Sequence, residues 1–455
     1  MAAHETLPDD APASRRDLCG LFAVSEKPRE QYLIGAESEK ILVFAADGSP
    51  LEYAGDRGVC RIFRHLEREH GWRPFGELPG GPTLGLKRER ASITLEPGAQ
   101  FELSGAPLAD VHAIAAEQAN HLSELTPIMA EMGLEWLTVG FQPLARLDQL
   151  PWVPKQRYPI MREYLPTRGG GALDMMQRTA TVQANFDWSS EQDGLRKLRV
   201  ALRLSPLVHA LFANSPFIEG RASGLSSERG RVWLDMDPSR SGLIERLWGE
   251  GEFGYRDYVE FALGAGMFLF WRDGQPVRNT GQTFADFLDH GFEGHRATVG
   301  DFRLHLTTLF PEVRLKNTLE VRSADALPPD LTLALVALWT GLLYDEQALG
   351  EVEAAVSVLR FEEVQKARPQ LVRSGLKDIE LGGSSGFAWA ERLLGWARGG
   401  LERRASAVRP SEAVYLEPIE RLVAARRSPA DEVLERYRQT GSIVAAARWD
   451  RTRLG

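Results

Sequence analysis

A strict alternation of polar and apolar residues over Thr179–Trp188 constrains the fold of this chain more than any other feature. Thr, Thr, Gln, Asn and Asp occupy every second position of the segment, and apolar residues occupy the positions between them. Successive side chains of a β-strand point to opposite faces of a sheet, so the segment predicts a strand with one polar and one apolar face. The polar face must meet either solvent or a ligand.

The segment Leu33–Phe44 places two carboxylates on one face of a second predicted strand. Glu37 and Glu39 are two positions apart, so both fall on the side that also carries Ile41 and Val43. Neighbouring carboxylates repel each other unless a positive group lies between them. A hard cation such as Mg²⁺, which prefers oxygen ligands, would make the arrangement favourable. The alternative is an edge strand whose carboxylates face solvent.

Two more segments carry charged residues in strand-like patterns. Ile93–Ser104 contains Glu96 and Glu102 on either side of a Pro-Gly break, which we expect to act as a bulge. In the short segment TLEVRS, Glu320 and Arg322 share one face. Together the four segments predict an α+β fold with a largely antiparallel sheet backed by helices. The other, concave face of this sheet would be a polar trough suited to Mg²⁺ and a nucleotide polyphosphate.

The remaining pattern divides the chain into three parts. Residues 1–17 are polar and predict a flexible N-terminus. Residues 18–350 mix strand and helix patterns and predict an α+β domain that contains all four of these segments. Residues 351–455 predict a helical region packed on that domain, since strand signals become few there. The helices expected in this last part are Glu351–Val364, Trp389–Arg404, Ser411–Ala425 and Ala430–Arg438.

Composition excludes several classes of protein. The chain has 455 residues, of which 43% are hydrophobic and 26% charged, values typical of a folded globular protein. A formal net charge of -9 gives no general attraction to nucleic acid or to an anionic membrane, and no apolar stretch approaches the roughly 20 residues of a membrane span. The N-terminus lacks the apolar core of a secretory signal, so we expect a cytoplasmic protein. Cys19 and Cys60 are the only cysteines and cannot build a thiolate metal cage.

Familiar nucleotide-binding and hydrolase motifs fail in this sequence. There is no Gly-Lys dipeptide and therefore no Walker A loop, and no G-x-G-x-x-G follows a strand. Gly382–Gly386 matches the nucleophile elbow of serine hydrolases, with Ser384 as nucleophile. However, the expected order places a histidine after the serine, and the last histidine of the chain is His305. If the chain binds ATP, another architecture must hold it.

Long blocks of the sequence resemble the plant and proteobacterial type of glutamate–cysteine ligase. The blocks run in order from about Asp17 to Arg438, and they are Ile34–Lys40, Gly85–Leu108, Val139–Pro143, Leu173–Glu191, Leu211–Gly220, Leu306–Asp325 and Gly341–Glu346. The resemblance implies a glutamine-synthetase-like carboxylate–amine ligase fold. It also implies ATP-dependent joining of the γ-carboxylate of L-glutamate to the amine of L-cysteine through a γ-glutamyl phosphate. The product would be γ-glutamylcysteine, formed in the first step of glutathione biosynthesis.

The resemblance further implies roles for individual residues. The ligands of two or three Mg²⁺ ions would be Glu37, Glu39, Glu96, Glu102, Gln183 and Glu320. Glu320 and Arg322 would be the catalytic residues, and Arg314 would join Arg322 in binding the phosphates of ATP. Arg162, Arg229 and Thr181 would bind the amino-acid substrates.

The sequence also departs from the family in two places. Neither cysteine sits where the plant enzymes carry regulatory disulfides, so the redox switch should be absent. The segment Glu228–Trp233 reads ERGRVW where the family has a run like MRSHIW, which alters the amino-acid pocket. Two alternatives stay open: a ligase on the same scaffold with a different amine acceptor, and an inactive nucleotide-binding protein. We expect small-molecule partners only, no nucleic acid or membrane, and a monomer or weak homodimer.

Overall fold

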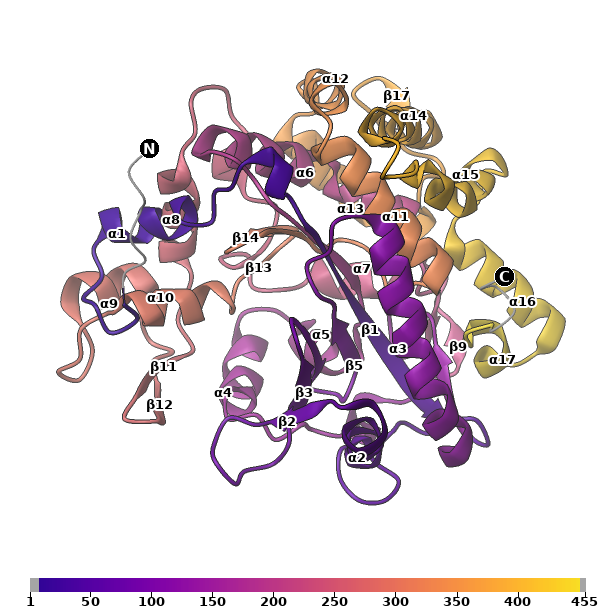
Figure 1. Ribbon diagram of the computed structural model, residues 1–455, viewed down its shortest axis with the longest axis horizontal. Helices are drawn as coiled ribbons and strands as arrows, with labels where there is room; N and C mark the ends of the chain where they lie inside the picture. The colour runs from indigo at the N-terminus through magenta and orange to yellow at the C-terminus, as the bar shows by residue number, and fades with distance from the viewer. Residues whose placement is uncertain (1–7, 451–455) are drawn as a thin grey trace.

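Residues 8–450 are described by the computed structural model, in which helices pack around one large central sheet (Figure 1). The sheet has nine strands in the order β14-β15-β7-β1-β5-β4-β3-β2, and β6 pairs with the second half of β1. Every pairing within it is antiparallel, which confirms the α+β class. The strands are β1 (Ile34–Phe44), β2 (Arg73–Phe75), β3 (Gly85–Arg88), β4 (Ala91–Leu95), β5 (Phe101–Ser104), β6 (Leu134–Leu137), β7 (Val182–Phe186), β14 (Val313–Leu315) and β15 (Leu319–Val321).

Helices cover one face of this sheet, and shorter elements surround it. Figure 1 shows α3 (Val111–Met132) lying beside β1, while α6 (Glu191–Leu211) contacts β14 and β15 and α11 (Pro329–Leu343) contacts β7. The other helices before the C-terminal region are α1 (Arg15–Ala23), α2 (Val59–His70), α4 (Arg157–Tyr164), α5 (Ala172–Arg178), α7 (Glu228–Trp233), α8 (Tyr255–Gly264), α9 (Phe284–His290) and α10 (Val299–Leu306). The short strands outside the large sheet are β8 (Phe217–Ile218), β9 (Arg221–Ala222), β10 (Ser241–Gly242), β11 (Leu269–Arg272), β12 (Gln275–Arg278), β13 (Phe310–Pro311), β16 (Glu380–Leu381) and β17 (Ser384–Ser385). No helix within residues 8–450 is both long and apolar enough to span a lipid bilayer.

Strand β1 shows how the sequence pattern sets the two faces of the sheet. Its even-numbered apolar residues, such as Ile34 and Leu42, join the clusters that include the buried residues of α3. Glu37 lies on the opposite face. Further along that same face, Ile41 and Val43 join a small apolar cluster formed with α17 (Ile443–Ala447). The face therefore changes from charged to apolar along one strand because a C-terminal helix covers its second half.

The Pro-Gly break between Glu96 and Glu102 is a hairpin turn, and the predicted bulge is wrong. The backbone N–H of Glu96 donates to the carbonyl oxygen of Gln100 over 3.1 Å, and Ala99 takes a positive φ of 64°. A Cβ on Gly98 would lie 2.3 Å from the carbonyl oxygen of Gln177. The turn therefore separates β4 from β5, which pair with each other.

The C-terminal region is helical, although its boundaries differ from the predicted ones. The first predicted helix is two helices, because residues 357–360 break it into α12 (Glu346–Val356) and α13 (Phe361–Ser374). The others are α14 (Gly386–Arg404), α15 (Glu417–Ala424) and α16 (Pro429–Thr440). Helix α13 packs on α6, and α14 packs on α11. The boundary at residue 350 stays a prediction, and residues 451–455 of the predicted region lie outside the described part.

The N-terminal segment is anchored wherever the structure describes it. Of the residues 1–17 that were predicted to be flexible, 1–7 lie outside the described residues. The N–H of Ala13 donates to the carbonyl oxygen of Ala297 over 3.0 Å, and Pro12 forms a bridge with Thr298. Ser14 and Asp17 form a capping box at the start of α1. The sequence could not show this anchoring, because the partners lie far along the chain.

Candidate active site

The strand registers bring the predicted site residues that lie on strands together on one face of the sheet. Glu39 lies opposite Glu102 across β1 and β5, and Glu37 lies opposite Gln183 across β1 and β7. On the far side of β7, Glu320 of β15 lies opposite Asn185. Residues opposite each other in antiparallel strands share a face, so segments far apart in the sequence meet in one trough.

Four carboxylates occupy one half of this trough and form no ion pair among residues 8–450. They are Glu37, Glu39, Glu96 and Glu102. Three of these carboxylates accept a hydrogen bond from an uncharged donor. The backbone N–H of Thr181 donates to Glu39 over 3.0 Å, the amide of Asn185 donates to Glu37 over 2.8 Å, and the hydroxyl of Thr94 donates to Glu102. We call this half the anionic half.

Burial makes the anionic half hard to ionise completely. The pKa of Glu102 is raised to about 8, mainly by burial and also by the nearby Glu37 and Glu96 carboxylates. Burial also raises the pKa of Glu39 well above its ordinary value, helped by Glu96 and Glu102. A carboxyl with so high a pKa holds its proton unless a positive charge arrives, so the anionic half is suited to a cation.

The other half of the trough holds three cations around a single carboxylate. Glu320 is fully buried and accepts two hydrogen bonds from Arg314, over 2.8 and 2.9 Å. The ammonium of Lys316 lies 3.3 Å from one of its oxygens, and Arg322 contacts the other. Burial alone would raise the pKa of Glu320, but these cations hold it well below its ordinary value. We call Arg314, Lys316, Glu320 and Arg322 the cationic half.

Arg322 joins the two halves of the trough. Its guanidinium donates to the side-chain oxygen of Gln183 over 2.6 Å as well as to Glu320. The amide nitrogen of Gln183 in turn lies 3.5 Å from a carboxylate oxygen of Glu39. The trough is therefore divided by charge, with Gln183 and Arg322 at the boundary.

Two of the residues predicted to bind substrate hold the backbone beyond β15. The guanidinium of Arg229 donates to the carbonyl oxygens of Arg322 and Ser323 over 2.8 and 2.9 Å. The hydroxyl of Thr181 donates to the carbonyl oxygen of Ala324 over 2.6 Å. Both residues thus position the segment that carries Arg322.

Arg162 lies apart from the trough in its contacts. It is exposed on α4, and its guanidinium lies 4.8 Å from the ring centre of Trp152.

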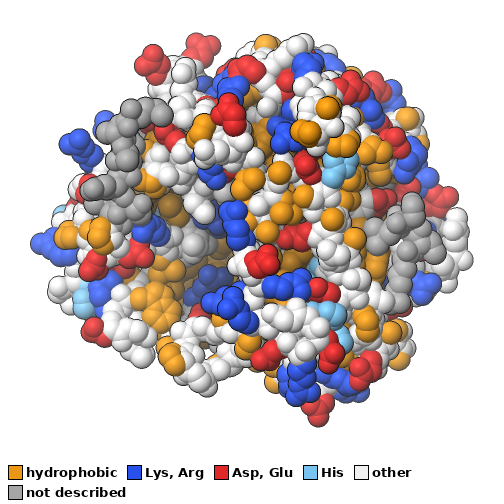
Figure 2. Space-filling view, in the orientation of Figure 1, with side chains coloured by type: hydrophobic (Ala, Val, Ile, Leu, Met, Phe, Trp, Pro, Cys, Tyr) orange, Lys and Arg blue, Asp and Glu red, His pale blue; other side chains and the backbone are white. Residues whose placement is uncertain are grey.

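The surface of the molecule mixes charges of both signs. Basic side chains with acidic ones beside them lie near the middle of the face drawn in Figure 2.

Sequence reasoning missed three residues of the trough or its surroundings. Lys316 lies two positions after Arg314 in the same block of family resemblance. This spacing places both side chains on one face of a strand, which could have indicated Lys316. Asn185 belongs to the polar face of β7 and was left without a role, although it binds Glu37. His209 gave no signal, because it reaches the segment beyond β15 only through the fold; its Nδ1 lies 2.8 Å from the carbonyl oxygen of Ser323.

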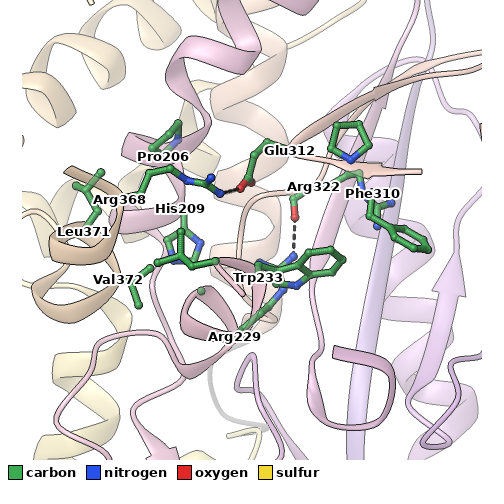
Figure 3. Close-up of a pocket in the computed structure, with 13 residues that line it drawn as sticks. Pro206, His209, Arg229, Trp233, Phe310, Glu312, Arg322, Arg368, Leu371 and Val372 are labelled. Carbon is green, nitrogen blue, oxygen red and sulfur yellow. Dashed lines mark hydrogen bonds and ion pairs between the residues drawn. The ribbon is translucent and has the colours of Figure 1, made fainter. Parts of the chain in front are cut away.

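A small cavity of about 30 Å³ adjoins the trough on the side of α6, α7 and α13 (Figure 3). Arg322 and Arg229 form part of its wall, together with Trp233. An ion pair between Arg368 of α13 and Glu312 closes one side. The C-terminal helical region therefore contributes directly to the surroundings of the site.

The fold is shared with a solved ligase of low sequence similarity. The structure of the glutamate–cysteine ligase of Francisella tularensis in complex with AMP matches with a TM-score of 0.52 at 13% identity. The match covers 94% of this chain and 89% of that chain. This likeness confirms the carboxylate–amine ligase fold that was expected from the sequence.

Curated plant enzymes are among the relatives with marked sequence similarity. The chloroplastic glutamate–cysteine ligase of Brassica juncea is 40% identical over 429 residues, which cover 94% of this chain and 81% of that protein. The chloroplastic enzyme of Arabidopsis thaliana is 39% identical, with 94% and 80% covered. These relatives are named as chloroplastic, so the prediction of a cytoplasmic location is wrong by this comparison. Amino-acid composition does not indicate a plastid location.

One family model matches nearly the whole described chain. It is the model of glutamate-cysteine ligase family 2, and it matches residues 33–448. The match includes every strand of the trough and the C-terminal helices α12 to α16. The two plant relatives near 40% identity support the same assignment. The chain belongs to glutamate-cysteine ligase family 2.

Proposed function

We propose that the two halves of the trough together support an ATP-dependent ligation in two steps. As a member of its family, the protein is a glutamate–cysteine ligase, which forms γ-glutamylcysteine in the first step of glutathione biosynthesis. In the first step the γ-carboxylate of L-glutamate attacks the γ-phosphorus of ATP, and ADP leaves. In the second the amine of L-cysteine attacks the γ-carbonyl carbon, and phosphate leaves. The observation that supports this proposal is the division of the trough by charge.

The anionic half has the donor set that Mg²⁺ requires. The proposed ligands of two or three ions are the four carboxylates of this half, with Gln183 from the boundary and Glu320 from the cationic half; the four are Glu37, Glu39, Glu96 and Glu102. The four carboxylates of the anionic half have no cation partner among residues 8–450, and the raised pKa values of Glu39 and Glu102 also favour a divalent cation. Bound Mg²⁺ would supply charge neutralisation between these carboxylates and the phosphates of ATP. Within residues 8–450, no three His, Cys, Asp or Glu side chains are grouped closely enough to hold a metal as they stand. Mg²⁺ binding would require these carboxylates to approach one another.

The cationic half would receive the phosphoryl group during its transfer. Arg314 and Arg322 are the proposed phosphate ligands, and Arg322 has the better position because it reaches both Glu320 and Gln183. A fixed guanidinium stabilises the charge that develops on phosphoryl oxygens without having to reorganise. Glu320 orients these cations, so we keep it with Arg322 as a catalytic residue.

The three residues assigned to substrate binding differ in how their side chains are engaged. The donors of Arg229 and Thr181 are engaged with backbone carbonyls, so these two residues would act by positioning Arg322 unless a substrate displaces those bonds. Arg162 is exposed and contacts no carboxylate among residues 8–450, which suits a residue that binds a substrate carboxylate from solvent.

Turnover with a panel of amines tests the function. The purified protein should release ADP when ATP, Mg²⁺, L-glutamate and L-cysteine are all present, and omission of any one should abolish release. Strong preference for another amine would make the chain a different glutamate ligase on this scaffold. Absence of ADP release with every amine would favour the inactive nucleotide-binding protein. Sedimentation of the pure protein tests the expected monomer or weak homodimer.

A further inference from the structure

An ion pair from the C-terminal region lies against the backbone that carries Arg322 (Figure 3). The guanidinium of Arg368, on α13, contacts the carboxylate of Glu312, which directly precedes β14. The two side chains are 11% and 16% exposed. A second nitrogen of the guanidinium donates to the side-chain oxygen of Gln365 over 3.0 Å, one turn earlier in α13. Arg368 is therefore held by its own helix while it pairs with Glu312 in a largely buried position.

The backbone of Glu312 extends the β14–β15 hairpin as far as Arg322. The N–H of Arg322 donates to the carbonyl oxygen of Glu312 over 3.1 Å, and the N–H of Glu312 donates to the carbonyl oxygen of Gly242 over 2.9 Å. Gly242 has a positive φ of 82°, and a Cβ there would lie 3.3 Å from Nη1 of Arg368. A side chain at residue 242 would thus strain the backbone and crowd the guanidinium. The ion pair fits closely beside the residue that joins the two halves of the trough.

Arg229 holds the other backbone polar group of Arg322, its carbonyl oxygen. Burial lowers the pKa of Arg229, whereas the carboxylates of Asp325 and Glu312 oppose this lowering. Glu312 is therefore close enough for its charge to act on Arg229, and both side chains line the same cavity. A hydrogen bond from a guanidinium to a carboxylate is stronger than one to a neutral carbonyl oxygen. Without a cation of its own, Glu312 would compete for Arg229 with the carbonyl oxygen of Arg322.

We propose that Arg368 is a positioning residue for the ligation, because its pairing with Glu312 keeps Arg229 on the backbone that carries Arg322. The guanidinium of Arg322 then stays at the boundary of the trough, between Gln183 and Glu320. This inference rests on the proposed function, in which Arg322 contacts the transferring phosphoryl group. Arg368 acts through other side chains and not on the substrates. The C-terminal helical region thereby affects phosphoryl transfer from outside the trough.

Competition by Glu312 distinguishes this role from that of an ion pair that only fastens α13. If the pair only fastened the helix, loss of either partner would have a similar effect, and loss of both would be no better. If Glu312 must be neutralised, loss of Arg368 alone leaves a largely buried carboxylate without its cation, which is unfavourable. Removal of the charge at residue 312 should then repair the loss of Arg368.

Steady-state ADP release by Arg368→Met, Glu312→Gln and the double variant tests the proposal, at a temperature well below each melting temperature. Arg368→Met should lower kcat about tenfold and change the KM for ATP and for L-glutamate less than about twofold, because the disturbed contact acts during phosphoryl transfer. Glu312→Gln and the double variant should both keep kcat within about threefold of the wild-type value. Arg272→Met is the matched control, because it removes a partly buried ion pair with Asp301 outside the trough. It should change kcat less than about twofold.

The outcomes separate this inference from the function itself. No ADP release by the wild-type protein would overturn both. With an active wild-type protein, a kcat in Arg368→Met within about twofold of the wild-type value would overturn the inference alone. A double variant as slow as Arg368→Met would show that the pair only fastens α13. A tenfold loss of kcat in Glu312→Gln, with a wild-type melting temperature, would overturn the inference whether or not Arg368→Met folds.

Discussion

Arg314 and Glu320 form a buried ion pair with two parallel hydrogen bonds, from Nε to Oε2 over 2.8 Å and from Nη2 to Oε1 over 2.9 Å. They lie directly opposite each other in the β14–β15 hairpin. Lys316 and Arg322 approach the same carboxylate, so one negative charge offsets three positive ones. The pair is therefore both a structural element of the hairpin and the base of the cationic half.

Glu320→Gln should lose both stability and turnover. The amide cannot offset the three cations, and breaking a buried ion pair of this kind typically costs about 3–5 kcal/mol. We expect a free energy of unfolding lower by a comparable amount and turnover at least about a hundredfold lower, measured by chemical denaturation and ADP release. Glu96→Gln is the matched control, because Glu96 is half-buried and outside any ion pair among residues 8–450. It should weaken the response to Mg²⁺ with little effect on stability. Wild-type stability in Glu320→Gln would contradict the assigned role.

The anionic half predicts how the metal-free protein responds to pH. The pKa of Glu102 is raised to about 8 in the folded chain from 4.5 in a model compound, so between these values the folded state binds more protons than the unfolded state. Stability must then fall as pH rises from about 5 to 8, and the raised pKa of Glu39 acts in the same direction. The melting temperature without divalent cations should therefore fall over this range.

Mg²⁺ should reverse this trend. A bound cation favours the ionised carboxylates, so the rise in melting temperature on adding MgCl₂ should be larger near pH 8 than near pH 6. NaCl at equal ionic strength is the control, and Glu102→Gln should flatten the pH dependence. A melting temperature that does not respond to Mg²⁺ at any pH would remove the metal assignment from these carboxylates.

Strand alternation was sufficient to predict the trough. It put Glu37 and Glu39 on one face of β1 and Gln183 on the polar face of β7, and the registers bring these faces together. The same rule failed at Pro97, because a Pro-Gly break fits a bulge or a turn equally well, and only the pairing of β4 with β5 decides between them.

Sequence patterns did not predict most contacts between segments that are distant in the chain. The partner of Glu320 could have been guessed, since Arg314 stands six residues earlier in a hairpin. Nothing local predicts that His209 of α6 meets Gly230 and Val372, or that α17 covers Ile41. Such contacts depend on how helices pack, which single-sequence patterns do not specify.

Reducing agents should leave turnover unchanged. Cys19 and Cys60 are both unpaired and half-buried, in α1 and α2. Burial raises the pKa of Cys19, and Glu191 raises it further, so its reactive thiolate is disfavoured. We expect dithiothreitol to change ADP release by less than about twofold. A several-fold activation that disappears in Cys19→Ser or Cys60→Ser would reveal a thiol switch.

The order of the two chemical steps predicts a mode of inhibition that depends on Arg322. If the γ-carboxylate is phosphorylated before the amine attacks, a sulfoximine of an S-alkyl homocysteine should bind far more tightly than L-glutamate, because it resembles the tetrahedral transition state. Its sulfoximine nitrogen can accept the γ-phosphoryl group, so inhibition should develop slowly and require both ATP and Mg²⁺. Immediate inhibition without ATP would rule out phosphorylation of the inhibitor.

Arg322→Lys should weaken this inhibition together with turnover, each by at least about a hundredfold. The guanidinium donates to Gln183 and Glu320 at the same time, and lysine cannot reproduce that planar fork around phosphoryl oxygens. Progress curves of ADP release with and without preincubation measure both effects. The matched control is Lys27→Arg, a cation exchange at the buried Asp187, which should leave the time course unchanged. Full activity and undiminished inhibition in Arg322→Lys would transfer the proposed phosphoryl contact to Arg314, the next guanidinium along the same hairpin.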